Sequence, residues 1–207
     1  MIKAVLFDVG GVLTTSPFES FARYEREQGL PDGFIRKLNS TNPDTNAWAQ
    51  LERNAVGFNE FCDLFEAEAL AAGGELKAIE VMACLSGDVR PEMIEAVRRC
   101  HERVKTGMLT NNVRAENEDA GGRLDGLLLP LFDVVIESSK AGVRKPDPRF
   151  YEMACEQLAI KPPEAVFLDD LGINLKPARA MGMTTIKVVD PDKALAELEA
   201  AVGFPVR

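Results

Sequence analysis

The fold is decided by residues 3–13, which read KAVLFDVGGVL. An apolar run over residues 4–7 is followed at once by Asp8 and then by Gly10 and Gly11. A short apolar run bounded by turn residues is typical of a buried strand in a parallel sheet. Ligands of open α/β sheets bind beyond the carboxyl ends of the strands, so Asp8 is predicted to lie at a binding crevice. The two glycines let the backbone turn sharply near a ligand, although an aspartate that only caps the turn fits the same residues.

Three later predicted strands also end in polar side chains. They are residues 108–109, 134–136 and 165–168, which lead to Thr110, Asn111 and Asn112, to Lys145, and to Asp169 and Asp170. A carboxylate nucleophile, hydroxyl and amide donors, a cation and carboxylates for a divalent metal are the parts of a phosphoryl-transfer site. The repetition of such ends favours a catalytic crevice over isolated turn residues.

The order Asp8, Thr110, Lys145 and Asp169-Asp170 resembles the four motifs of the haloacid dehalogenase (HAD) superfamily, most of whose members are magnesium-dependent phosphatases. Residues 167–179, FLDDLGINLKPAR, are similar to the N-terminal phosphatase domain of soluble epoxide hydrolase and to the HAD domain of acyl-CoA dehydrogenase family member 10. The resemblance implies an α/β fold, a HAD-like Rossmannoid parallel sheet with helices on both faces. The predicted strands and helices alternate along the second half of the chain, as such a sheet requires.

Residues 16–88 depart from this alternation and are predicted to contain helices only. Helices are expected to begin at Ser16-Pro17 and at Pro31, and another passes through Trp48. The resemblance implies a helical C1-type cap inserted after the first strand. We therefore expect a catalytic core of residues 1–15 and 89–207 and a cap of residues 16–88. Within the core, residues 114–125 are expected to form a solvated loop and residues 124–132 a short helix.

Two side chains of this helical segment, Trp48 and Arg53, and the polar residues 42–46 attract attention as substrate contacts. An aromatic at helical spacing usually packs in a core, and clustered Asn, Asp and Pro usually form a turn. We favour these structural interpretations.

The resemblance assigns a role to each motif. Asp8 attacks phosphorus and forms an aspartyl-phosphate, and Lys145 neutralises charge on both the nucleophile and the transferred group. The resemblance also implies that Thr110, Asn111 and Lys145 bind the phosphate. It implies that Mg2+ is bound by Asp8, the Gly10 carbonyl and Asp170. Asp169 and Asn174 would support these metal ligands through hydrogen bonds.

Gly10 is the one departure from the family pattern. Most phosphatases of this superfamily have an aspartate two residues after the nucleophile, which protonates the leaving group and later deprotonates water. A general acid/base contributes about 10²–10⁴-fold to a rate. Relatives similar to acyl-CoA dehydrogenase family member 10 share this glycine.

Three functions are compatible with these residues. The first is a Mg2+-dependent phosphatase acting on a small phosphorylated metabolite, which is slow, or is restricted to phosphates whose leaving group needs little protonation, or takes an acid from the cap. The second is a metal-independent hydrolase of the 2-haloacid dehalogenase type, in which Asp8 displaces halide. The third is a weakly active phosphate-binding or regulatory domain. The carboxylates at Asp169 and Asp170 speak for the first.

Composition excludes several other classes. The 207 residues carry a net charge of −9, which disfavours general nucleic-acid or anionic-membrane binding. No apolar run approaches the roughly 18 residues of a membrane span, and a strand is predicted too near the first residue for a signal peptide. We expect a cytoplasmic monomer or homodimer whose partner is a small phosphorylated substrate. The separated cysteines suit reduced thiols in a core, and the single histidine, His101, suits a surface position.

Overall fold

The computed structural model describes residues 1–85, 87–112 and 128–207. The loop predicted for residues 114–125 lies outside the described residues, as do residues 124–127 of the helix predicted for residues 124–132. The described end of that helix holds one short turn, η3 (Leu129–Leu131).

A five-stranded parallel sheet forms the centre of the molecule, in the order β3-β2-β1-β4-β5. The strands are β1 (Ala4–Phe7), β2 (Lys105–Thr110), β3 (Val134–Glu137), β4 (Ala165–Asp169) and β5 (Thr184–Lys187). The middle strands β1 and β4 are buried along their whole length, which explains their unbroken apolar sequences. The predicted α/β parallel sheet is confirmed.

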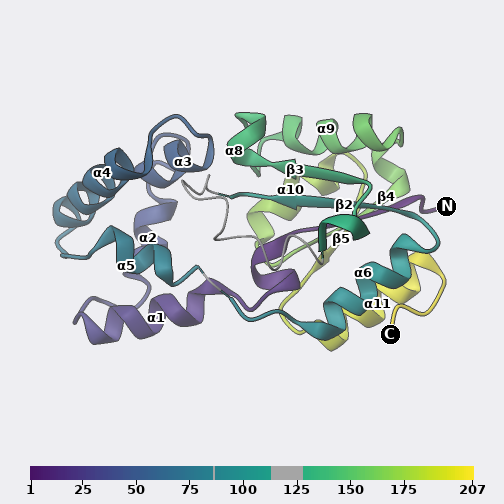
Figure 1. The fold of residues 1–207 in the computed structure, drawn as a ribbon, viewed down its shortest axis with the longest axis horizontal. Helices are drawn as coiled ribbons and strands as arrows, with labels where there is room; N and C mark the ends of the chain where they lie inside the picture. The colour runs from purple at the N-terminus through teal and green to yellow at the C-terminus, as the bar shows by residue number, and fades with distance from the viewer. Residues whose placement is uncertain (86, 113–127) are drawn as a thin grey trace.

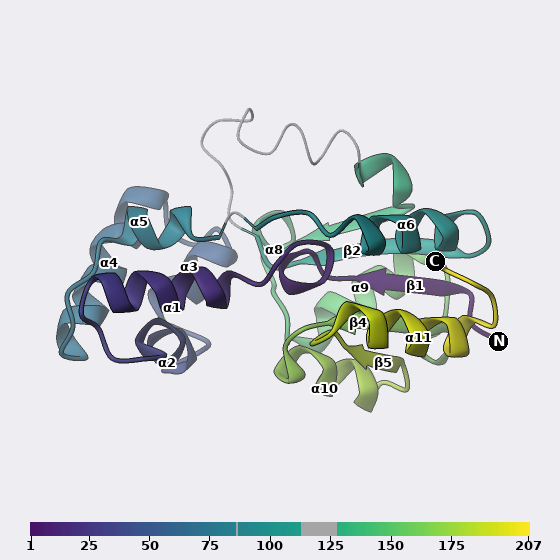
Figure 2. The same ribbon diagram turned by 90° about the horizontal axis from the view of Figure 1, so that it is seen from below.

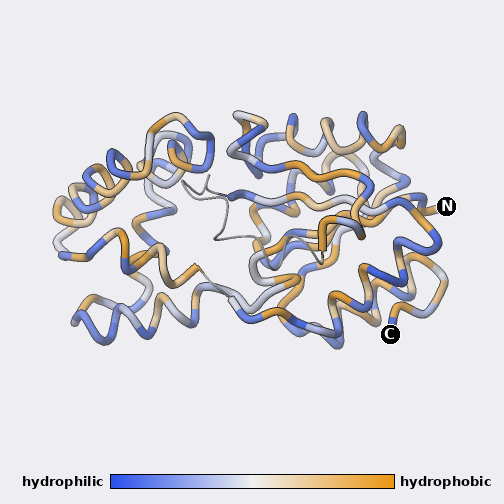
Figure 3. The backbone as a smooth tube through the Cα atoms, in the orientation of Figure 1, coloured by the Kyte–Doolittle hydropathy of each residue, from blue (hydrophilic) through white to orange (hydrophobic). Residues whose placement is uncertain are grey.

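Helices cover both faces of this sheet. Alternate residues of β1 point to opposite faces, so Val5 and Phe7 belong to one core cluster and Ala4 and Leu6 to another. The first cluster is closed by α6 (Pro91–His101) and α11 (Pro191–Val202), and the second by α9 (Pro148–Leu158) and α10 (Gly172–Ala180). Figure 1 shows these pairs on opposite sides of the sheet. Along these helices hydrophilic and hydrophobic residues alternate (Figure 3), as one-sided burial requires.

The helices α1 to α5 form a separate unit beyond the carboxyl ends of the strands (Figures 1 and 2). They are α1 (Pro17–Glu27), α2 (Phe34–Ser40), α3 (Ala47–Glu52), α4 (Phe58–Ala71) and α5 (Ala78–Ala83). This helical unit has its own hydrophobic core, in which Trp48 packs edge-on against Phe61 and Phe65. The interpretation of Trp48 as a core residue is confirmed.

The start of α2 differs from the prediction. The helix begins at Phe34 and not at Pro31, because Gly33 adopts a left-handed conformation with φ of 74°. The buried carboxylate of Glu25 accepts hydrogen bonds from the backbone N–H groups of Gly33 and Ile35, both at 2.8 Å. Those bonds satisfy donors that a helix start leaves open.

Two backbone connections join the helical unit to the sheet, and they run side by side. Thr14 and Val89 form an isolated antiparallel bridge. The N–H of Thr15 donates to the carbonyl of Asp88 at 2.8 Å, and the N–H of Arg90 donates to the carbonyl of Leu13 at 2.9 Å. The two connections are therefore hydrogen-bonded to each other as a short antiparallel pair.

Other sequence expectations concern the surface and the thiols. His101 is exposed, as predicted, and Cys100 and Cys155 are buried free thiols. Cys62 and Cys84 are half-buried, so they are less enclosed than the prediction of core thiols implied. In the part of the chain that the structure describes, no helix combines the length and the apolar character that crossing a membrane requires.

Candidate active site

The carboxyl ends of four adjacent strands bring the predicted site residues together. Asp8 follows β1, Thr110 ends β2, Asp169 ends β4, and Lys145 lies in the loop between α8 (Ser138–Ala141) and α9. Asp8, Lys145 and Asp169 are buried at this edge, and the helical unit lies beyond it (Figure 2).

Lys145 is the centre of the site. Its side chain is 1% exposed, and its Nζ lies 2.8 Å from Asp8 Oδ2 and 2.7 Å from Asp169 Oδ2. Burial alone would lower the pKa of Lys145, but the two carboxylates outweigh it and raise that pKa. The ammonium group is therefore held charged beside Asp8.

Asp169 is occupied by neighbours of the protein itself. Its Oδ2 accepts from Lys145, and its Oδ1 accepts from the N–H of Leu171 at 2.8 Å. The Asn174 Nδ2 group lies 3.1 Å from both oxygens. These bonds leave Asp169 little capacity to ligate a metal directly and suit it to hold Lys145.

Asp170 has a more open carboxylate. One oxygen from each of Asp8, Asp169 and Asp170 lies within 4.8 Å of the other two, a spacing compatible with a shared cation. Burial and the nearby Asp169 raise the pKa of Asp170 to about 6. Burial also raises the pKa of Asp8 above its usual range, against the effect of Lys145. A cation bound here would favour the ionised form of both carboxylates.

Asn111 and Thr110 differ in what their side chains do. Asn111 Oδ1 accepts from the backbone N–H of Lys145 at 2.9 Å, and its Nδ2 donates to the Lys145 carbonyl at 3.0 Å. This pair of hydrogen bonds fixes the backbone of the Lys145 loop. The Thr110 hydroxyl makes no hydrogen bond within the part of the chain that the structure describes, so it is available to an anion.

Gly10 and Gly11 have different conformations. Gly10 has φ of −64° and ψ of 128°, which any residue adopts, and a Cβ added there would meet no heavy atom within 4 Å outside its chain neighbours. Gly11 has φ of 76°, and a Cβ there would lie 2.3 Å from Asp170 Oδ2. The sharp turn and the close approach therefore require Gly11, whereas Gly10 leaves space.

Sequence reasoning missed three contributors to this site. Ser16 was expected to cap α1, but its hydroxyl donates to Asp170 Oδ2 at 3.4 Å and makes no cap. Asn112, which follows β2, donates to Glu137 of β3 and accepts from Ser139 of α8. Arg144 had no predicted role and reaches the helical unit. No spacing in the sequence indicates these contacts, because each joins segments far apart in the chain.

A family model described as haloacid dehalogenase-like hydrolase matches residues 2–182. The chain belongs to this family, and the predicted HAD resemblance is confirmed. It is a HAD-family hydrolase with phosphatases among its relatives.

Individual relatives extend this result. The chain is 34% identical to acyl-CoA dehydrogenase family member 10 of Mus musculus, over 99% of this chain and 19% of that protein. It is 32% identical to bifunctional epoxide hydrolase 2 of Sus scrofa, over 98% of this chain and 39% of that protein. The chain therefore spans well under half the length of both.

A third relative is nearer in length. A phosphatase of Mycobacterium tuberculosis is 34% identical over 88% of this chain and 85% of its own. Among solved structures, a HAD-like family hydrolase from Porphyromonas gingivalis superposes with a TM-score of 0.71, at 22% identity, over 98% of each chain. That similarity establishes the fold.

Proposed function

We propose that this chain is a Mg2+-dependent phosphohydrolase that acts on a small phosphorylated metabolite through an aspartyl-phosphate on Asp8. The observation that carries the proposal is the Lys145 ammonium held between Asp8 and Asp169, with Asp170 in the same carboxylate cluster. A cation beside a buried carboxylate suits the attack of that carboxylate on an anionic phosphoryl group.

The reaction proceeds in two displacements. An oxygen of Asp8 attacks phosphorus, the bond from phosphorus to the ester oxygen breaks, and the leaving group departs as an oxyanion with the bonding electron pair and takes a proton from solvent, to which the water of the second step later gives one up. Water then attacks the same phosphorus and breaks its bond to Asp8, which releases inorganic phosphate and the free carboxylate. Lys145 stabilises negative charge in both steps, while the Thr110 hydroxyl and the Asn111 backbone bind phosphate oxygens.

The donor set fits Mg2+. Asp8, the Gly10 carbonyl and Asp170 are hard oxygen ligands, which Mg2+ prefers when waters complete its coordination. Asp169 and Asn174 support this arrangement through hydrogen bonds, because Asp169 accepts from both Lys145 and Asn174. Bound Mg2+ would neutralise charge on the phosphoryl group.

Gly10 defines the substrate class. Without a side chain there, no residue of the motif protonates the departing oxygen. The enzyme should therefore favour esters whose leaving groups are weak bases, such as aryl or acyl phosphates.

The helical unit completes the proposal. We assign residues 16–88 as a cap over the core of residues 1–15 and 89–207, since its helices lie beyond the strand ends that carry the site (Figure 2). A cap excludes water and selects the substrate.

The experiment that tests this function measures phosphate release from p-nitrophenyl phosphate with and without Mg2+, beside chloride release from 2-chloropropionate. Phosphate release that requires Mg2+ is the expected result. Chloride release without metal would instead establish dehalogenase chemistry. Inactivity in both assays would contradict the proposal and favour a phosphate-binding domain.

A further inference from the structure

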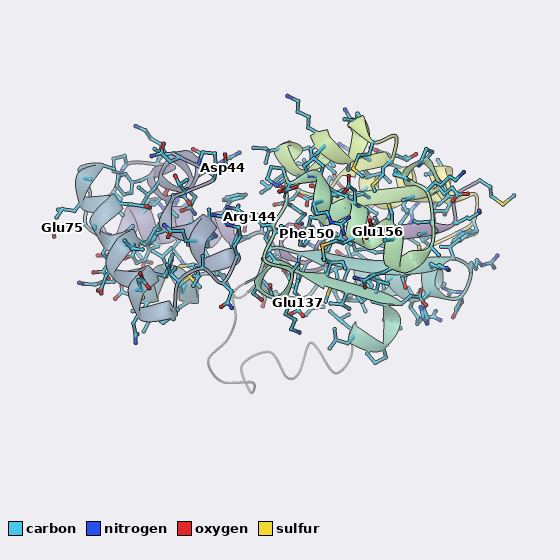
Figure 4. All side chains as sticks on the ribbon, turned by 90° about the horizontal axis from the view of Figure 1, so that it is seen from above. Asp44, Glu75, Glu137, Arg144, Phe150 and Glu156 are labelled. Atoms are coloured by element: carbon cyan, nitrogen blue, oxygen red, sulfur yellow. The ribbon has the colours of Figure 1, made fainter. Side chains whose placement is uncertain are left out.

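The side chain of Arg144 crosses from the loop that carries Lys145 to the helical unit. Its Nε lies 2.6 Å from Oε2 of Glu52, the last residue of α3, and its Nη1 donates to the carbonyl of Pro43 at 3.3 Å. Figure 4 shows Arg144 at the junction between the two parts of the molecule, on the side where Asp44 lies. These contacts join segments far apart in the chain.

The Glu52 carboxylate is enclosed by this junction. Its side chain is 10% exposed, and its Oε1 accepts a hydrogen bond from Trp48 Nε1 at 3.0 Å. Burial raises the pKa of Glu52, while Arg144 and Trp48 act in the opposite direction. An enclosed carboxylate without a cation is strongly unfavourable, so Glu52 depends on Arg144 in a way that an exposed pair would not.

The backbone of the loop that carries Arg144 and Lys145 is held to the core by hydrogen bonds. Asn111 holds both the N–H and the carbonyl of Lys145, the next residue. The side chain of Lys145 bridges Asp8 and Asp169. Arg144 therefore connects α3 to the loop whose next residue, Lys145, contacts Asp8.

We propose that Arg144 is a positioning residue whose ion pair with Glu52 locks the helical unit onto the Lys145 loop. The proposal deepens the phosphohydrolase function above and rests on it. The pair has a second effect: it neutralises a carboxylate near Lys145, where an anionic substrate would otherwise be repelled. Loss of Arg144 alone is then worse than loss of both charges.

The kinetic test compares Arg144→Met, Glu52→Gln and the double variant on p-nitrophenyl phosphate. We expect Arg144→Met to lower kcat about 10–100-fold and to raise KM, since small misplacements at an active site have effects of this size. The added Glu52→Gln change should restore part of the loss, and Arg144→Lys should lose less. Arg149→Met is the matched control, because Arg149 pairs with Glu156 on the exposed side of α9. Equal effects of Arg144→Met and Arg149→Met, or strictly additive losses in the double variant, would overturn the proposal.

A spectroscopic test does not depend on turnover. Trp48 is the only tryptophan of the chain and donates to Glu52, so its fluorescence reports the junction directly. We expect greater acrylamide quenching of Trp48 in Arg144→Met than in the wild type or Arg149→Met. Unchanged quenching would overturn the lock even in a protein that hydrolyses phosphate. If quenching increases in Arg144→Met while the wild type hydrolyses no phosphate ester, the result would support the lock and refute the phosphohydrolase function.

Discussion

At the residue scale, the backbone requires a glycine at only one of the two adjacent positions, Gly10 and Gly11. The sequence suggested that both serve a sharp turn. Only Gly11 requires the absence of a side chain, because its φ is positive and a Cβ there would lie 2.3 Å from Asp170 Oδ2. Gly10 has an ordinary conformation and open space around it, so the turn does not require a glycine at this position.

The space at Gly10 allows that group to be restored. We expect Gly10→Asp to fold normally and to increase hydrolysis of alkyl phosphates more than that of aryl phosphates, because only the alkyl alcohol needs a proton as it leaves. The measurement is kcat/KM on a matched pair of esters. An equal effect on both substrates would remove this account of the glycine.

Asp170 gives the site a dependence on pH. Its pKa is raised to about 6 by burial, so in the metal-free protein it holds a proton below that pH, and a Mg2+ ion that took Asp170 as a ligand would have to displace that proton. We expect the apparent Mg2+ affinity to be nearly constant above about pH 7 and to fall by up to about tenfold per pH unit below about pH 6. Titration calorimetry across this range checks it. An affinity as strong at about pH 5 as at about pH 7.5 would contradict the assignment of Asp170 as a ligand.

At the element scale, residues of helices α9 and α10 fix a strand-end residue of the site through hydrogen bonds. Asn174 of α10 binds Asp169, and the Tyr151 hydroxyl of α9 donates to the Asn174 carbonyl at 2.7 Å. The sequence predicted that helices alternate with strands in this half of the chain, as α9 and α10 do. It did not predict the bond between them, since periodicity identifies a buried face but not which buried polar atoms meet.

The Tyr151 bond makes a measurable contribution. We expect Tyr151→Phe to lower the free energy of unfolding by about 0.5–1.5 kcal/mol, because a buried hydrogen bond is lost without loss of packing volume. Urea denaturation measures this. Tyr24→Phe is the control: its hydroxyl accepts from the Lys77 N–H in the helical unit, so it should reduce stability without altering Mg2+ dependence. A Tyr151→Phe protein as stable as the wild type would contradict the role of this bond.

At the scale of the whole molecule, the sequence predicted the sheet and the helical unit, but not the contacts between segments distant in the chain. The sheet, its order of motifs and the helical segment follow from apolar runs and from Asp8, Lys145 and Asp169 at strand ends. Asn111 and Arg144 could not be interpreted in this way. Each contributes through a partner distant in the chain, Lys145 for Asn111 and Glu52 for Arg144. The Asn111 contact forms only once the strands of the core lie side by side, and the Arg144 contact only once the helical unit packs on the core.

The central claim is that Asp8 is the nucleophile of a Mg2+-dependent phosphohydrolase. It is tested most directly by the turnover of p-nitrophenyl phosphate in Asp8→Asn beside the wild type, at saturating Mg2+. An amide cannot accept and release the phosphoryl group as the carboxylate does, so we expect turnover to fall by at least about 10³-fold while the fold is retained. Unchanged Mg2+-dependent turnover in Asp8→Asn would show that the nucleophile lies elsewhere.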